Sequence, residues 1–128
     1  MKKYQLNIII IAAIAVFSCN ERKSSPPLFE LVQNSGIIFT NTVQDNDTIN
    51  ILNYRNFYNG GGVATGDINN DGLADVFFTA NMGSNKLFLN KGNWKFEDIS
   101  EKAGFHNKEK WSTGVVMVDV NHEGWLDI

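Results

Sequence analysis

The chain has 128 residues, of which 43% are hydrophobic, and this length suits about one domain at most. Its net charge of −3 and its lack of long basic runs argue against a nucleic-acid partner, because nucleic acid is bound by clustered Lys and Arg. Eleven glycines against two prolines indicate many tight turns rather than a disordered coil.

The N-terminal residues are laid out like an export signal. Lys2-Lys3 precedes an unbroken apolar run from Ile8 to Phe17. This run is shorter than the roughly 20 residues that a membrane-spanning helix needs, and it fits the core of a signal peptide.

The run ends in Val16-Phe17-Ser18-Cys19, which resembles a bacterial lipobox, and Cys19 is the only cysteine. The resemblance implies that residues 1–18 are a lipoprotein signal peptide and that Cys19 carries lipid after cleavage. The protein would then be exported and lipid-anchored to a bacterial membrane, at the outer membrane or the cell surface. The alternative is an ordinary signal peptide with a chance cysteine.

A polar segment follows the cysteine. Residues 19–28 include NERKSSPP, which predicts a tether that holds the folded part away from the membrane. The composition then changes, and residues 29–128 form the predicted folded region. Asp45 to Thr48 predicts a polar turn, while the stretch from Ile51 to Phe57 receives no assignment.

Several short β-rich runs separated by turn residues occupy the second half of the chain. Apolar side chains alternate with polar ones in places, as where Trp94 and Phe96 alternate with Lys95 and Glu97. No long stretch has a period near 3.6, so the sequence predicts an all-β fold. The predicted strands are Val63–Thr65, Asp75–Ala80, Lys86–Asn90, Trp94–Ile99 and Thr113–Val118.

An internal repeat appears when the chain is shifted by 52 positions. Gly62-Val63 then aligns with Gly114-Val115, and Asp67, Asn69, Gly72 and Asp75 align with Asp119, Asn121, Gly124 and Asp127. A repeat near 50 residues with about four strands is the sequence sign of a β-propeller blade. Coincidence between two turn-rich segments is unlikely with so many identities in one register.

The loop from Asp67 to Asp75 has the spacing of a calcium-binding loop. Oxygen-bearing side chains stand at positions one, three, five and nine, as Asp67, Asn69, Asp71 and Asp75. Glycine stands at position six, where such a loop turns sharply, and Leu73 at position seven would offer its backbone carbonyl. A turn rich in Asp, Asn and Gly that binds no ion is the alternative.

An EF-hand or a dockerin uses the same spacing but needs a helix after the loop. An EF-hand also needs a bidentate carboxylate at position twelve. Phe78 stands there, inside a segment that favours a strand, so the loop is predicted to join two strands.

The second loop, from Asp119 to Asp127, would use Asp119, Asn121, Glu123 and Asp127. Glu123 replaces the aspartate of the first loop and is one methylene longer, so it can crowd an ion. His122 stands at a non-ligand position and is predicted to be a solvated turn residue, and His106 is predicted to lie on the surface.

At these motifs the chain resembles the FG-GAP or VCBS repeat family of the integrin-alpha-like propeller type. It looks most like the lipoprotein branch that pairs such repeats with a cartilage-acidic-protein-like C-terminal domain. The matching stretches are Phe57–Ala64, Gly66–Asp75, Asn85–Asn90, Phe96–Ser100 and Ala103-Gly104.

The resemblance implies a propeller of about seven blades with Ca²⁺ in loops between strands. Its ligands would be Asp67, Asn69, Asp71, the carbonyl of Leu73, and Asp75. With about 52 residues per repeat, the chain is expected to hold one complete blade and the start of a second, as the N-terminal fragment of a longer protein.

Three functions are compatible with these features. A surface-anchored, calcium-binding module for binding or scaffolding is favoured, with calcium mainly structural and an unidentified protein or glycan ligand. An enzyme is disfavoured, because no Ser/His/Asp set, nucleophilic cysteine or phosphate loop is present; a catalytic domain could belong to a larger extracellular protein of which this is a non-catalytic part. Glycan binding needs exposed aromatic side chains, and Trp94, Trp111 and Trp125 are predicted to be core or blade-packing residues instead.

Overall fold

The computed structural model of the protein describes residues 25–105 and 111–128. The chain divides into two compact units, Met1–Leu31 and Val32–Ile128, and the strands found in the described residues lie in the second unit. In the first unit, residues 25–31 are exposed and have no regular secondary structure. The predicted signal peptide, Cys19 and residues 20–24 of the tether lie outside the described residues. No helix among the described residues has the length and apolar character needed to cross a bilayer.

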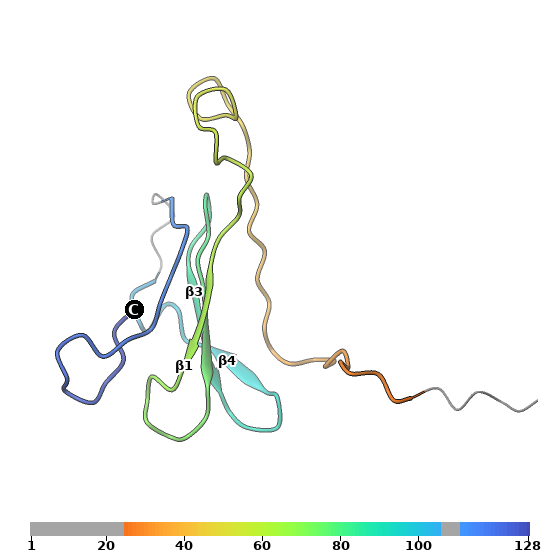
Figure 1. Ribbon diagram of the computed structural model, residues 1–128, viewed down its shortest axis with the longest axis vertical. Coiled ribbons are helices and arrows are strands. Elements are labelled where there is room, and N and C mark those ends of the chain that lie inside the picture. Colours follow the sequence, from red (N-terminus) through yellow and green to blue (C-terminus); the bar gives the residue numbers. More distant parts are fainter. Residues whose placement is uncertain (1–24, 106–110) are drawn as a thin grey trace, which may run out of the picture. The chain divides into compact units, whose positions relative to one another are not determined.

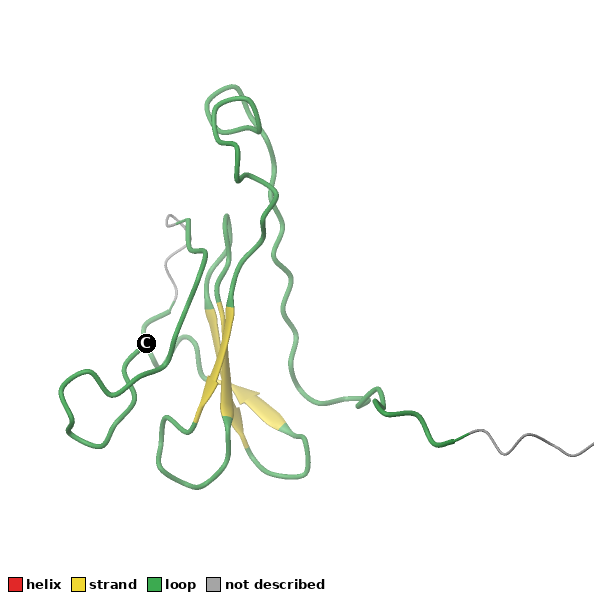
Figure 2. Ribbon diagram, viewed as in Figure 1, coloured by secondary structure: helices red, strands yellow, loops and turns green. Residues whose placement is uncertain are grey.

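Four short strands form one antiparallel sheet in sequence order (Figures 1 and 2). They are β1 (Val63–Gly66), β2 (Asp75–Phe78), β3 (Lys86–Asn90) and β4 (Phe96–Asp98). The described part of the chain contains no helix. The predicted all-β class is therefore confirmed, and an up-and-down sheet of four strands is the unit of a β-propeller blade.

Both faces of this sheet carry apolar side chains. Ala64, Phe77 and Leu87 lie opposite one another on neighbouring strands and are buried on one face. Phe105 packs edge-on against Phe77 there, with 4.7 Å between ring centroids. On the other face, Phe39 stacks on Phe78 at 4.8 Å. A sheet with two apolar faces needs cover on both sides, as a blade has between its neighbours.

The strand boundaries show where local pattern and tertiary pairing differ. β3 has the predicted bounds and β1 is one residue longer, whereas β2 ends at Phe78 instead of Ala80. The ladder with β3 ends there, because the backbone N–H of Ala80 donates to the side chain of Asn85 rather than to a strand.

The prediction that a strand begins at Trp94 is wrong. Asn93 and Trp94 have φ values of 52° and 59°, in the left-handed region, and they form the turn between β3 and β4. The N–H of Lys91 donates to the carbonyl of Lys95 across this turn at 2.7 Å. Trp94 is 68% exposed, so it belongs to neither face of the sheet.

The predicted strand from Thr113 to Val118 forms no ladder and makes a single antiparallel bridge, between Val118 and Asp127. Two backbone hydrogen bonds form this bridge, at 2.9 and 3.1 Å. The segment nevertheless alternates between half-buried Val115 and Met117 and exposed Val116 and Val118, as an extended strand does.

This segment lies against β1 because the facing residues are small. A Cβ on Gly62 would lie 2.7 Å from the carbonyl oxygen of Thr113, and one on Gly66 would lie 3.0 Å from the Sδ of Met117. Gly62, Ala64 and Gly66 share one face of the strand by the two-residue period. Removing side chains from that face lets the first strand of the second repeat approach the backbone of the first blade.

Replacement of Gly62 by Ala is therefore expected to destabilise the fold by about 1–3 kcal/mol, because the new Cβ meets backbone rather than a movable side chain. Gly114, its counterpart in the repeat, is the matched control, since a Cβ there has open space. Urea unfolding of both variants measures the difference, and equal midpoints for the two would contradict this packing.

Candidate metal centre

The loop between β1 and β2 is closed by the carboxylate of its first residue. Asp67 Oδ1 accepts the N–H of Asp71 at 3.0 Å, and Oδ2 accepts the N–H of Gly72 at 2.7 Å. Asn70 and Gly72 adopt left-handed backbone, with φ of 56° and 86°, which Asn and Gly tolerate. The spacing of Asp, Asn and Gly thus builds a tight turn from local hydrogen bonds.

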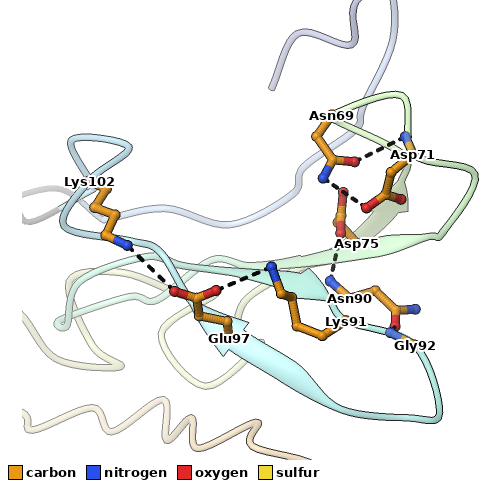
Figure 3. Close-up of polar contacts among 8 residues, drawn as sticks. All are labelled: Asn69, Asp71, Asp75, Asn90, Lys91, Gly92, Glu97 and Lys102. Carbon is orange, nitrogen blue, oxygen red and sulfur yellow. Dashed lines mark hydrogen bonds and ion pairs between the residues drawn. The ribbon is translucent and has the colours of Figure 1, made fainter.

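The side chains at positions three and five join the same turn (Figure 3). Asn69 Nδ2 donates to Asp71 Oδ2 at 2.9 Å, and Asn69 Oδ1 accepts the N–H of Asp71 at 3.3 Å. Asp71 Oδ1 accepts the N–H of Leu73 at 2.9 Å. Hydrogen bonds therefore link the polar groups of Asp67, Asn69 and Asp71 within one exposed loop.

Asp75 has a different position, at the start of β2, where its side chain is fully buried. Its Oδ2 accepts the N–H of Ile68 at 3.0 Å, and its Oδ1 accepts the N–H of Asn90 at 2.7 Å (Figure 3). Asn90 Nδ2 in turn donates to the carbonyl of Ala74. Asp75 thus joins the beginning of the loop to the end of β3.

The loop carboxylates have no cationic side chain beside them among the described residues. The ion pairs of that part of the chain use other acids: Glu97 with Lys91 and Lys102, and Asp98 with Lys86. The Lys91 hydrogen bond and the nearby Lys102 charge lower the pKa of Glu97 (Figure 3). Lysines thus neutralise the acids of β4, while the negative charge of the loop stays uncompensated.

Asp98 keeps its charge against an opposing effect. Partial burial raises its pKa, but hydrogen bonds from Lys86 and Ser100 outweigh burial and lower the pKa below its ordinary value. The hydroxyl of Ser100 also accepts the N–H of Leu87 at 2.9 Å. This cluster fixes the end of β4 to β3 and belongs to the frame of the blade.

The second loop repeats the side-chain-to-backbone hydrogen bonds that close the first. Asp119 accepts the N–H groups of Glu123 and Gly124, at 3.1 and 2.8 Å. Asn121 Oδ1 accepts the N–H of Glu123, and Asp127 Oδ2 accepts the N–H of Val120. Each of these bonds has its counterpart 52 residues earlier, and the φ values of His122 (60°) and Gly124 (89°) match those of Asn70 and Gly72.

The two loops differ at the ninth position and at the fifth. Asp127 is exposed, whereas Asp75 is buried. Asp75 accepts the N–H of Asn90 in β3, whereas the side chain of Asp127 accepts only the N–H of Val120 among the hydrogen bonds of the described residues. Glu123 receives no side-chain bond like that from Asn69 to Asp71 among those found in the described residues.

The residues of the first loop fit a hard cation in chemistry but not as a pure carboxylate cluster. Within the described ranges, no three His, Cys, Asp or Glu side chains converge on one metal position. The candidate set instead mixes carboxylates with the amide of Asn69 and the carbonyl of Leu73. Oxygens of this mixed kind, on an exposed loop, suit Ca²⁺, which accepts six to eight oxygens in loose geometry.

The other candidate residues have varied positions. His122 is exposed in its turn, as predicted, and His106 lies outside the described residues. The prediction that all three tryptophans pack inside is wrong for Trp94 and Trp125, which are 68% and 51% exposed because both stand in turns. Trp111 does pack, with its ring 5.4 Å from that of buried Phe57.

The four-stranded blade, followed by a second copy of its first loop, defines a β-propeller type of repeat. Comparison with protein families gives the same result, because residues 67–128 match the model of the FG-GAP-like repeat. The match covers just under half of the chain, and it supports an FG-GAP-like repeat in residues 67–128.

The chain is also similar to curated proteins that carry the name cartilage acidic protein 1. It is 39% identical to the protein of Xenopus tropicalis over 74 residues, which are 57% of this chain. It is 36% identical to those of Mus musculus over 69 residues and Homo sapiens over 72 residues, 54% and 56% of this chain. The matched region spans 11% of the length of each relative. No solved structure matches the chain significantly.

Replacement of Asp75 by Asn is expected to cost about 1–3 kcal/mol even with calcium removed by a chelator. An amide offers one acceptor oxygen, so one buried backbone N–H would lose its partner and face an NH₂ group. The same change at exposed Asp127 is the matched control and should cost well under half as much. Chemical unfolding in chelator provides the measurement, and an unaffected Asp75→Asn variant would refute the bridging role.

Proposed function

We propose that the chain is a calcium-binding repeat module of a surface-anchored binding or scaffolding protein, in which calcium is mainly structural. The first site would use Asp67, Asn69, Asp71, the carbonyl of Leu73, and Asp75. The second would use Asp119, Asn121, Glu123 and Asp127. One ion in a loop would neutralise its carboxylates and hold the turn between two strands.

The observation that carries the proposal is the repetition of one loop geometry, 52 residues apart, around acids that no described lysine or arginine neutralises. Carboxylates in one short loop repel one another, and a divalent cation would reduce that repulsion. A structural role for the ion fits an exposed loop that joins two neighbouring strands of one sheet.

A module of this kind would work outside the cell. Extracellular calcium sites are often weak, with dissociation constants on the order of 10⁻⁴–10⁻³ M, which suits surroundings rich in calcium. We propose export through residues 1–18 and a lipid anchor at Cys19. The ligand would be a protein or a glycan, and exposed Trp94 and Trp125 offer aromatic surface for either.

Calcium is expected to raise the melting temperature of the intact chain. With a dissociation constant on the order of 10⁻³ M, about 10 mM calcium adds roughly 1.4 kcal/mol per site, or about 5 °C. Asp71→Ala should abolish the contribution of the first loop, while Asp45→Ala, which removes an exposed acid outside both loops, should keep it. Thermal unfolding by circular dichroism with calcium or magnesium measures this, and a wild type without a calcium response would refute the site.

The anchor is tested separately by cell fractionation. Cys19→Ser removes the thiol that would carry lipid, so the protein should move from the membrane fraction to the soluble fraction. Ser18→Ala serves as the control, since it keeps a small residue before the cysteine. Full retention of the Cys19→Ser variant in membranes would contradict the anchor and leave the calcium proposal intact.

A further inference from the structure

The two loops are connected directly by a side chain that neither loop needs as a ligand. Asn70 Nδ2 donates to the backbone carbonyl oxygen of Gly124 at 3.0 Å, across 54 residues of sequence. Asn70 stands at position four of the first loop, between Asn69 and Asp71, where it is not a candidate ligand, and its backbone is left-handed with φ of 56°. The conformation of the first loop therefore fixes the donor.

The acceptor of this bond, the carbonyl oxygen of Gly124, lies beside a candidate ligand of the second loop. The carbonyl of Gly124 belongs to the peptide unit that joins it to Trp125, the residue at position seven of the second loop. Position seven is where a calcium loop presents its backbone carbonyl. The bond from Asn70 orients the peptide unit between Gly124 and Trp125. It therefore restrains the backbone directly before the carbonyl of Trp125, which an ion in the second loop would use.

An apolar contact joins the same two loops at their bases. Gly66 directly precedes Asp67, and Leu126 directly precedes Asp127. A Cβ on Gly66 would lie 2.6 Å from Leu126 Cδ1, so the leucine side chain reaches the backbone of β1. One loop therefore meets the next through a polar contact at its tip and an apolar contact at its base.

We propose that the two loops are coupled cation sites and that Asn70 is the positioning residue that couples them. An ion in the first loop would fix Asn69 and Asp71, and so would fix Asn70 between them. Asn70, through its bond to Gly124, would then keep the second loop in the conformation that binds its own ion. This inference rests on the proposed calcium binding and adds its regulation. By linkage, occupancy of the second loop would strengthen binding in the first by the same factor.

The test follows two backbone amides by NMR during a calcium titration of the intact chain. Gly72 and Gly124 stand at position six of their loops and donate to Asp67 and Asp119, so each reports on its own site. Asp71→Ala disables the first loop. It should raise the calcium midpoint of the Gly124 signal about fivefold, near the lower end of usual coupling strengths.

The same change is then made in an Asn70→Gly background. Glycine keeps the left-handed backbone and removes only the amide donor, so Asp71→Ala should no longer move the Gly124 midpoint. His122→Gly is the matched control, because His122 holds position four of the second loop with φ of 60°, and it should leave the coupling in place.

The outcomes separate this inference from the proposed function. If Gly72 responds to calcium but the Gly124 midpoint ignores Asp71→Ala, the coupling is refuted and the first site stands. Persistence of the fivefold effect without Asn70 would refute the role of that residue. A chain in which neither signal responds to calcium would refute the calcium proposal itself.

Discussion

The buried carboxylate of Asp75 is the constraint on which the blade and its loop both depend. A charged group without solvent is costly unless its oxygens are hydrogen-bonded, and here each oxygen accepts a backbone N–H. One N–H comes from Ile68 in the loop, and the other comes from Asn90 at the end of β3. The same residue therefore sets the register at this end of the sheet and fixes the entry of the candidate cation loop.

The packing of neighbouring repeats follows from a second constraint, which is the small size of the side chains on one face of β1. Gly62, Ala64 and Gly66 leave little side-chain volume on one side of the strand, so the segment from Thr113 to Met117 reaches its backbone. Thr79 strengthens this contact, because its hydroxyl accepts the N–H of Gly62 at 2.6 Å and donates to the carbonyl of Thr113. The blade is thus stabilised by the next repeat, which packs on β1, as well as by its own hairpins.

The sequence predicted those features that depend on local pattern. The all-β class, the 52-residue repeat, the position of β3 and the turn geometry of both loops follow from alternation and from the fixed spacing of Asp, Asn and Gly. It missed Trp94, since a tryptophan with a left-handed φ is rare and alternation alone favoured a strand.

Contacts between residues far apart in the sequence could not be predicted from the residues around them. Asn81 is buried because its side chain binds Asn41, the carbonyl of Gly60 and the carbonyl of Ser112 at once. Nothing in the residues around Asn81 marks it as such a junction, and Asn70 is equally unmarked as the link between loops. The spacing of the first loop predicted its candidate ligands, but only tertiary structure separated exposed Asp71 from buried Asp75.

The comparison of the two loops shows which properties are local and which are not. Both copies make the same backbone hydrogen bonds, although the second has glutamate in place of Asp71, histidine in place of Asn70, and no ladder beside it. These hydrogen bonds therefore depend on the nine consecutive residues of the loop itself. Burial of the ninth residue is different, since Asp75 is covered only where Asn90 of β3 lies against it and Asp127 is exposed. Burial of the ninth residue thus depends on a neighbouring strand, while the hydrogen bonds within the loop do not.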